Sequence, residues 1–184
     1  MRFYRICLLL TALGFFSTIG VPSSNAEPDL ERGRAVAMGA GTTTSSRSAC
    51  HTCHGMHGAG DSSGAFPRLS GQAAWYLYKQ LKDYASGERQ NDVMSPVAKA
   101  LTDQQMEDVA AFYAAQQVSA EAPRAEPDSL LLQRGAAISA RGLPDRGVAA
   151  CVNCHGPSGR GLPPSFPYLA GQYAPYVELQ FRFW

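Results

Sequence analysis

One pattern, Cys-x-x-Cys-His, occurs twice in the chain and constrains its fold more than any other feature. Residues 49–55 read ACHTCHG, and residues 150–156 read ACVNCHG. Three chemistries use a Cys-x-x-Cys pair, namely a shared zinc ion, a thioredoxin-like dithiol and the covalent attachment of haem. Each chemistry predicts a different setting in the sequence, so the surroundings of the two pairs decide among them.

The surroundings favour haem attachment over the two alternatives. A zinc ribbon unites pairs that are usually about 15–20 residues apart, whereas these pairs begin at residues 50 and 151. A thioredoxin-like site expects a βαβ setting, and no strand-rich stretch precedes either pair. In covalent attachment, both thiols add to the porphyrin vinyl groups and the next histidine becomes the proximal iron ligand. We therefore predict two covalently bound haem c groups, attached through Cys50, Cys53, Cys151 and Cys154 and ligated by His54 and His155.

The N-terminus predicts export. The first residues, MRFYR, are basic, the apolar run at 6–21 follows, and the small residues SNA stand at 24–26. Such a run is short for a membrane span of about 20 residues, although an uncleaved anchor is the alternative. We predict a signal peptide over 1–26, cleaved after Ala26, and a periplasmic location. Cys7 leaves with this peptide, while the four motif cysteines remain.

Composition excludes one class of partner and sets the scale of the fold. The chain has 184 residues, 45% of them hydrophobic, with a formal net charge of +1. It therefore has room for one ordinary domain or two small ones. Because the charge is nearly balanced, we expect no binding of nucleic acid.

Both motifs belong to a longer internal repeat. FPRLSGQAAWYLYKQLKDY at 66–84 matches FPYLAGQYAPYVELQFRFW at 166–184, and ERGRAVA at 31–37 matches LQRGAAI at 132–138. A repeat of this length indicates one structural unit used twice. Aligned on the Arg-Gly dipeptide that they share, the last two segments place Gly33 opposite Gly135.

The first unit predicts three helices. Asp29 can cap the first helix. Residues 72–86 carry an apolar stripe with a helical period, and Gly87 follows as a stop. Thr102 and Gln105 have the spacing of a capping box and predict the start of a third helix. No segment alternates convincingly as a strand, so the predicted fold class is all-α.

A polar, proline-containing segment separates the units, as expected of a linker. We predict a signal peptide at 1–26, a first domain at 29–118, a linker at 119–128 and a second domain at 129–184.

With tandem Cys-x-x-Cys-His-Gly motifs, each followed by Phe-Pro-x-Leu-x-Gly-Gln, the chain resembles the di-haem class I cytochromes c of the c-four type over essentially all of residues 29–184. The same module is similar to the di-haem cytochrome subunit of sulfide-oxidising flavocytochromes. The resemblance implies two tandem cytochrome c domains. It also implies that a glycine of the first helix packs on an aromatic residue of the last, here Gly33 on Phe112 or Tyr113. Gly135 has no such counterpart.

The sixth iron ligand of the first haem is predicted to be a methionine, the usual choice in electron-transfer haems. Met38 ends the first helix, Met106 lies on the apolar face of the last helix, and Met56 is too near His54 to reach the opposite side of the ring. Met94 lies in a polar segment that we predict as a loop, and the family resemblance points to the same residue. We predict His54 and Met94 as the two axial ligands of haem 1, with His51 and His57 facing solvent or haem propionates.

The second unit offers no equivalent methionine. No methionine follows Met106, and the repeat register places Trp184 opposite Tyr84. The counterpart of 85–117 is not in the chain, so we expect the second domain to be C-terminally truncated and the sixth ligand of haem 2 to be absent from the chain. Three explanations stay open: a fragment of a longer product, a real truncation with an open haem, or completion by a partner chain.

These observations predict an electron carrier rather than an enzyme. The expected partners are redox proteins, such as an oxidase, a respiratory complex or a dehydrogenase, and loose membrane association stays open. One alternative is a peroxidase-like enzyme or ligand sensor that uses an open second haem. Another is the electron-accepting subunit of a flavoprotein dehydrogenase.

Overall fold

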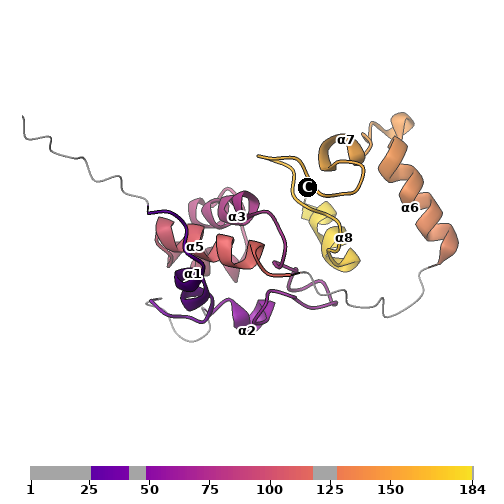
Figure 1. Ribbon diagram of the computed structural model, residues 1–184. Coiled ribbons are helices and arrows are strands. Elements are labelled where there is room, and N and C mark those ends of the chain that lie inside the picture. The colour runs from indigo at the N-terminus through magenta and orange to yellow at the C-terminus, as the bar shows by residue number, and fades with distance from the viewer. Residues whose placement is uncertain (1–25, 42–48, 118–127, 184) are drawn as a thin grey trace, which may run out of the picture.

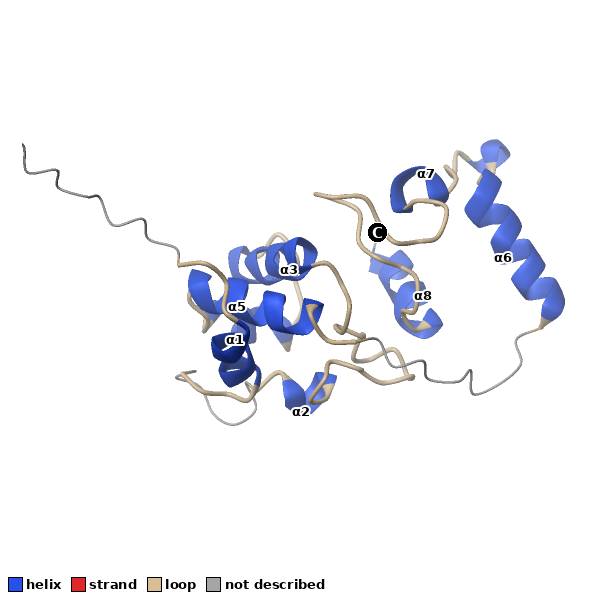
Figure 2. Ribbon diagram, viewed as in Figure 1, coloured by secondary structure: helices blue, strands red, loops and turns tan. Residues whose placement is uncertain are grey.

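The computed structural model describes residues 26–41, 49–117 and 128–183. Nearly all of the predicted signal peptide and linker lie outside these residues. The described chain consists of helices and loops, with two isolated β-bridges and no strand (Figure 2). The predicted all-α class is therefore confirmed. None of the helices within this part of the chain has the length and hydropathy that a membrane span requires.

Three helices of the first unit form its core: α1 (Leu30–Ala37), α3 (Ala74–Ser86) and α5 (Asp103–Ala114) (Figure 1). Their apolar faces meet, and the short α4 (Met94–Lys99) packs on α3. The buried side chains of this core are Val36, Ala37, Leu77, Leu101, Met106, Val109, Ala110, Phe112 and Tyr113.

Three predicted helix boundaries of this unit are confirmed, namely the N-caps at Asp29 and Thr102 and the stop at Gly87, whereas α3 begins at Ala74, two residues after the predicted start of the stripe. The Asp29 carboxylate accepts a hydrogen bond from the Arg32 amide at 2.8 Å. Gly87 ends α3 with φ of 89°, a left-handed conformation that favours glycine. Thr102 and Gln105 form both hydrogen bonds of the capping box. Local side-chain chemistry therefore determines where these helices begin and end.

Gly33 lets α1 approach α5 to backbone contact. A Cβ atom at this position would lie 2.1 Å from the Asp108 carbonyl oxygen and 2.8 Å from Cβ of Phe112. Tyr113 lies elsewhere, with its ring against Gly58. Of the two aromatic residues predicted to face Gly33, Phe112 is therefore the one that does.

An ion pair that the sequence did not predict locks the same crossing. Nε and Nη2 of Arg32 donate to the Asp108 carboxylate at 2.8 and 2.9 Å, and the Asp29 amide donates to it at 2.8 Å. Asp108 is only 2% exposed. A buried carboxylate needs such donors, because burying it unpaired is costly.

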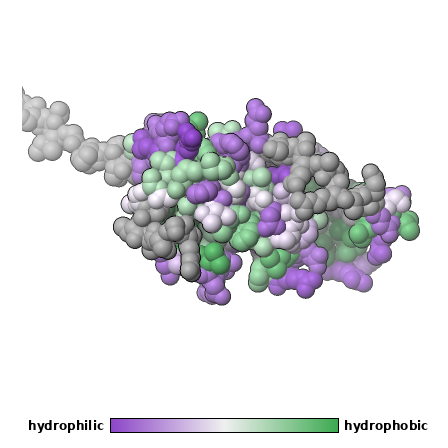
Figure 3. Space-filling view, turned by 90° about the horizontal axis from the view of Figure 1, so that it is seen from below, coloured by the Kyte–Doolittle hydropathy of each residue, from purple (hydrophilic) through white to green (hydrophobic). Residues whose placement is uncertain are grey.

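The second unit is more open within the described residues. It contains α6 (Ser129–Arg141), a 3₁₀ turn at Pro144–Arg146, α7 (Val152–His155) and α8 (Ala174–Phe183). Helix α6 lies at the far end of the molecule from α1 and has no buried side chain. Its residues Leu130, Leu131 and Leu132 are more than half exposed, and apolar surface is visible at this end in Figure 3.

Candidate haem-attachment sites

The two Cys-x-x-Cys-His motifs fold into the same short helical turn. Helix α2 (His51–His54) starts directly after Cys50, and α7 starts directly after Cys151. Each turn ends at a glycine with positive φ, Gly55 at 79° and Gly156 at 76°. This turn places the second thiol and the imidazole on adjacent helical residues and the first thiol at the N-cap, so the three groups that would attach a haem are held by one short element.

Each motif histidine is oriented by a backbone carbonyl. Nδ1 of His54 lies 3.0 Å from the Pro67 oxygen, and Nδ1 of His155 lies 2.9 Å from the Pro167 oxygen. A carbonyl only accepts, so Nδ1 carries the proton and Nε2 is left as the ligating atom. Such outer partners fix the ring orientation of metal-bound histidines.

The loop that follows each histidine is also built in the same way in both repeats. The Gly60 amide donates to the His54 carbonyl at 2.8 Å, and the Gly161 amide donates to the His155 carbonyl at 2.8 Å. The rings of Phe66 and Phe166 stand edge-on to the respective histidine rings, with centroids 6.2 and 5.8 Å apart. We call this arrangement of histidine, proline carbonyl, glycine turn and phenylalanine ring a histidine cradle. The sequence repeat therefore encodes two such cradles, one around His54 and one around His155.

The burial of Cys50 and His54 favours uncharged forms of both side chains, as in a thioether link and a neutral imidazole, over the thiolate of a dithiol redox couple. The cysteines of both motifs form no disulfide. Burial raises the pKa of the Cys50 thiol to about 11, whereas redox Cys-x-x-Cys sites have a lowered pKa. Burial also lowers the pKa of His54, against the opposing effect of its bond to Pro67. A neutral imidazole is the form that binds iron.

A buried hydroxyl also marks the first site. The Tyr113 ring packs on Gly58, and among the described residues its hydroxyl has no hydrogen-bond partner. Burial raises the pKa of this phenol. An unsatisfied buried hydroxyl behind the attachment motif fits a site that is completed by a bound group.

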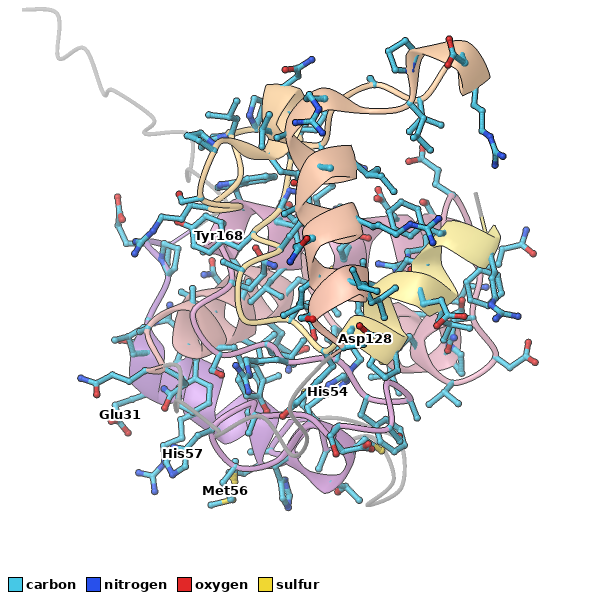
Figure 4. All side chains as sticks on the ribbon, turned by 90° about the vertical axis from the view of Figure 1, so that its right-hand side faces the viewer. Glu31, His54, Met56, His57, Asp128 and Tyr168 are labelled. Carbon is cyan, nitrogen blue, oxygen red and sulfur yellow. The ribbon has the colours of Figure 1, made fainter. Side chains whose placement is uncertain are left out.

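The methionines of the first unit differ in their surroundings. Met106 is 4% exposed within the core, and Met38 packs against the same core at the end of α1. Met56 is 50% exposed and lies at the outer edge of the molecule beside His57 (Figure 4). The prediction of a loop at Met94 is wrong, because Met94 is the first residue of helix α4. The Asn91 side chain caps this turn by accepting from the Met94 amide at 2.8 Å, a local signal that the sequence contained.

The remaining histidines have partners within the protein. Nδ1 of His51 lies 3.2 Å from the Ala37 oxygen, and Nδ1 of the exposed His57 lies 3.2 Å from Oε1 of Gln116. Across the described residues, no three His, Cys, Asp or Glu side chains gather as a metal site. The two cysteine pairs therefore do not converge in the manner of a zinc ribbon.

The two repeats meet at a junction that the sequence did not predict. Arg89 donates to the Tyr176 hydroxyl at 3.1 Å and to Oε1 of Gln180 at 2.5 Å, and it also hydrogen-bonds Gln80 of its own unit. The Arg89 guanidinium lies over the Tyr84 ring, 4.8 Å from its centroid. These contacts connect the end of α3 to α8.

Known proteins share this architecture. The Cytochrome c family model matches residues 31–115. A cytochrome c4 from Pseudomonas aeruginosa is 37% identical over 79% of this chain and 72% of its own length. The crystal structure of reduced cytochrome c4 from Pseudomonas stutzeri superposes with a TM-score of 0.70 at 32% identity, covering 84% of this chain and 79% of that chain.

Another relative carries a different name. A thiosulfate dehydrogenase electron acceptor from Stutzerimonas stutzeri is 42% identical over 74% of this chain, which spans 62% of that relative's length. The match to cytochrome c4 from Pseudomonas aeruginosa extends over more than two thirds of that protein. The chain therefore belongs to the cytochrome c4 family of di-haem class I c-type cytochromes, whose cofactor is covalently bound haem c.

Proposed function

We propose that this protein carries electrons between redox proteins outside the cytoplasm. The observation that supports this most directly is the pair of matching histidine cradles, at His54 and His155, which lie in two repeats that contact each other. Two haems held in one chain, one in each repeat, would give an electron an entry site and an exit site. The haem supplies the redox chemistry when bound, through the Fe(III)/Fe(II) couple.

The protein's own residues would hold each haem and its iron. The cysteines Cys50, Cys53, Cys151 and Cys154 would fix the edge of each macrocycle. His54 and His155 would each bind iron through Nε2, because the proline carbonyls keep the proton on Nδ1. Met94 would fill the sixth position in the first repeat and close that iron to substrates. A thioether ligand favours Fe(II) and raises the reduction potential.

Ligand binding distinguishes a carrier from a haem enzyme or gas sensor. The matured, haem-loaded protein would be titrated with CO in the ferrous state and with cyanide in the ferric state. A carrier should show reversible redox titration of both haems and no ligand spectrum at haem 1, where Met94 would fill the sixth position. Rapid CO binding to one haem, with turnover of peroxide, would support the peroxidase-like alternative instead.

Met94 has a direct spectroscopic test. Replacing Met94 with Ala should abolish the near-infrared Met–Fe(III) charge-transfer band of haem 1, because no thioether then reaches that iron. Met56→Ala is the matched control, since Met56 is half exposed at the outer edge, and this variant should keep the band. Survival of the band in Met94→Ala would assign the sixth ligand to another residue.

A more specific donor is suggested by the relatives. Two of them, from Stutzerimonas stutzeri and Thiomonas intermedia, are named thiosulfate dehydrogenase electron acceptors, at 42% and 38% identity. A solved thiosulfate dehydrogenase, TsdBA from Marichromatium purpuratum, superposes with a TM-score of 0.70 at 37% identity, covering 85% of this chain and 33% of that chain. We therefore propose a sulfur-oxidising dehydrogenase as the electron donor.

Stopped-flow spectroscopy tests this donor. The oxidised protein would be mixed with a purified thiosulfate dehydrogenase and thiosulfate, and haem reduction would be followed. Fast reduction that requires both components supports the proposed donor. Reduction that is equally slow with and without the dehydrogenase would exclude it, while leaving the general carrier function in place.

The proposed location follows from the N-terminal segment. Residues 1–26 would direct export and be cleaved after Ala26, leaving two domains at 29–118 and 129–184 joined by 119–128. A fusion of residues 1–30 to an alkaline phosphatase that is active only in the periplasm would report export. Mass spectrometry of the purified protein would give the cleavage site and the number of attached haems.

A further inference from the structure

Two glutamines at equivalent positions of the repeat each bind the backbone of the other repeat, and we call each such contact a glutamine clasp. Gln72 Nε2 donates to the Tyr168 carbonyl, and Gln72 Oε1 accepts from the Tyr168 amide, both at 3.0 Å. Gln172 Nε2 donates to the Arg68 carbonyl, and Gln172 Oε1 accepts from the Arg68 amide, both again at 3.0 Å. Arg68 and Tyr168 are themselves equivalent in the repeat, so the two clasps are related by a local twofold pseudosymmetry.

The backbone that each glutamine binds leads directly to a proximal histidine. The Arg68 amide belongs to the same peptide group as the Pro67 carbonyl, which holds Nδ1 of His54 at 3.0 Å. The Tyr168 amide belongs to the same peptide group as the Pro167 carbonyl, which holds Nδ1 of His155 at 2.9 Å. Each glutamine is therefore one peptide group away from the iron ligand of the other repeat.

A hydrogen bond at one end of a peptide group changes the polarity of the group's other end. Hydrogen bonds in a chain polarise one another, with a strengthening of about 10–30% per bond. When its N–H donates to a glutamine oxygen, the peptide's carbonyl becomes a stronger acceptor for the histidine Nδ1–H. A stronger outer acceptor raises the basicity of a metal-bound histidine. A more basic imidazole stabilises Fe(III) relative to Fe(II), which lowers the reduction potential.

We propose that the two glutamines tune the haems crosswise: Gln172 sets the potential of the haem ligated by His54, and Gln72 that of the haem ligated by His155. Burial supports a strong effect on the second haem, since Gln72 is only 8% exposed. The inference deepens the proposed electron-carrier function, because it makes the properties of each haem depend on the docking of the two repeats. Gln72 and Gln172 act here as positioning residues, since neither is an iron ligand.

The test uses Gln172→Met and Gln72→Met in the full haem-loaded protein. Methionine keeps much of the glutamine volume but neither accepts from the peptide N–H nor donates to the carbonyl. The haem-methyl NMR resonances of each repeat, followed during redox titration, give the potential of each haem separately. Gln172→Met should raise the potential mainly at haem 1 and move the hyperfine-shifted Nδ1–H resonance of His54. Gln72→Met should act mainly at haem 2.

Two further variants separate tuning from simple loosening of the junction. Gln180→Met removes a contact with Arg89 across the same junction but touches neither proline peptide, so it should not shift one haem selectively. Gln172→Glu keeps an acceptor at the Arg68 amide and makes it anionic, so it should lower the potential of haem 1. An effect confined to the haem of the mutated repeat, or equal shifts of both haems in every variant, would overturn the proposal.

The readout is independent of the proposed function. The potentials and the Nδ1–H resonances are measured on the isolated protein without a redox partner. A protein that failed to exchange electrons with any dehydrogenase or oxidase could still show the crosswise pattern. Conversely, loss of the pattern would leave the carrier function untouched.

Discussion

Helices α1 and α6 carry the same Arg-Gly dipeptide in different surroundings. In α1, Arg32 binds the buried Asp108 carboxylate, and Gly33 contacts the backbone of α5. In α6, a Cβ atom on Gly135 would meet nothing within 4 Å, and no side chain of the helix is buried. One helix is thus fixed by a long-range crossing, while the other is held within the described residues by local bonds.

The histidine cradles do not share this difference. The His54 and His155 cradles have the same carbonyl bond, the same glycine turn and the same edge-on phenylalanine. The histidine–carbonyl bonds of the two cradles join residues 13 and 12 positions apart, whereas the Arg32–Asp108 bond of the helical core spans 76 positions. The comparison shows that haem attachment geometry and domain core are encoded separately.

Gly33→Ala should produce the largest change. The added methyl group would overlap the Asp108 carbonyl, which belongs to rigid backbone, so α1 and α5 would have to separate. We expect a loss of about 3 kcal/mol in the free energy of unfolding, measured by urea denaturation of the haem-loaded protein. Unchanged stability would mean that the α1–α5 crossing is looser than the structure shows.

Asp108→Asn should come next. The change removes the charge that Arg32 pairs with. The new amide has one oxygen, which cannot accept from all four present donors, namely Nε and Nη2 of Arg32, the Asp29 amide and Nε2 of Gln104. Because Arg32 is half exposed, we expect a loss of about 2 kcal/mol in the free energy of unfolding at neutral pH. Arg134→Gln in α6 is the matched control, and its effect on unfolding should be within about 0.5 kcal/mol.

The Asp108 contribution should also depend on pH. Burial alone would raise the pKa of this carboxyl, but hydrogen bonds from Arg32, the Asp29 amide and Gln104 outweigh burial and lower it. The folded pKa thus lies below the unfolded value of about 3.9. The stabilisation is therefore complete above that value and is lost as the pH falls through the folded pKa. Urea titrations of wild type and Asp108→Asn should converge in acid, and a constant difference would contradict the assigned ion pair.

Arg89→Met tests the contact between the repeats. Loss of the bonds to Tyr176 and Gln180 should weaken docking of α8 by about 1 kcal/mol, since the guanidinium is only partly buried. Hydrogen exchange of the α8 amides should then become faster. Arg182→Met is the control, because its ion pair with Glu178 lies within α8 and is exposed. Equal exchange in the two variants would show that Arg89 does not hold the repeats together.

Much of the first unit was predictable because its signals are local. The caps at Asp29 and Thr102, the stop at Gly87 and the attachment motif each act within a few residues of the chain. The Gly33 crossing also followed from the family resemblance, although the choice between Phe112 and Tyr113 did not. That choice depends on where the Gly58 loop takes up one ring.

The features that the sequence did not predict are the long-range ones. The Arg32–Asp108 pair and the glutamine clasps join residues more than 70 positions apart, and no local pattern specifies such a pairing. Helix α4 is an exception, because its signal is local: Asn91 stands three residues before Met94, and its side chain accepts from the Met94 amide. The repeat suggested two equivalent units, but not that a residue such as Gln172 contacts the other unit.

Gly135→Ala should have the smallest effect, with a sign opposite to that of Gly33→Ala. Glycine destabilises a helix interior by roughly 0.5–1 kcal/mol relative to alanine, mainly through backbone entropy. Since the new methyl group would meet no atom within 4 Å, this gain should appear undiminished as slower hydrogen exchange of the α6 amides. Faster exchange or lower stability would mean that another surface covers Gly135 in solution. In that case α6 would be packed like α1, and the contrast between the two helices would not hold outside the described chain.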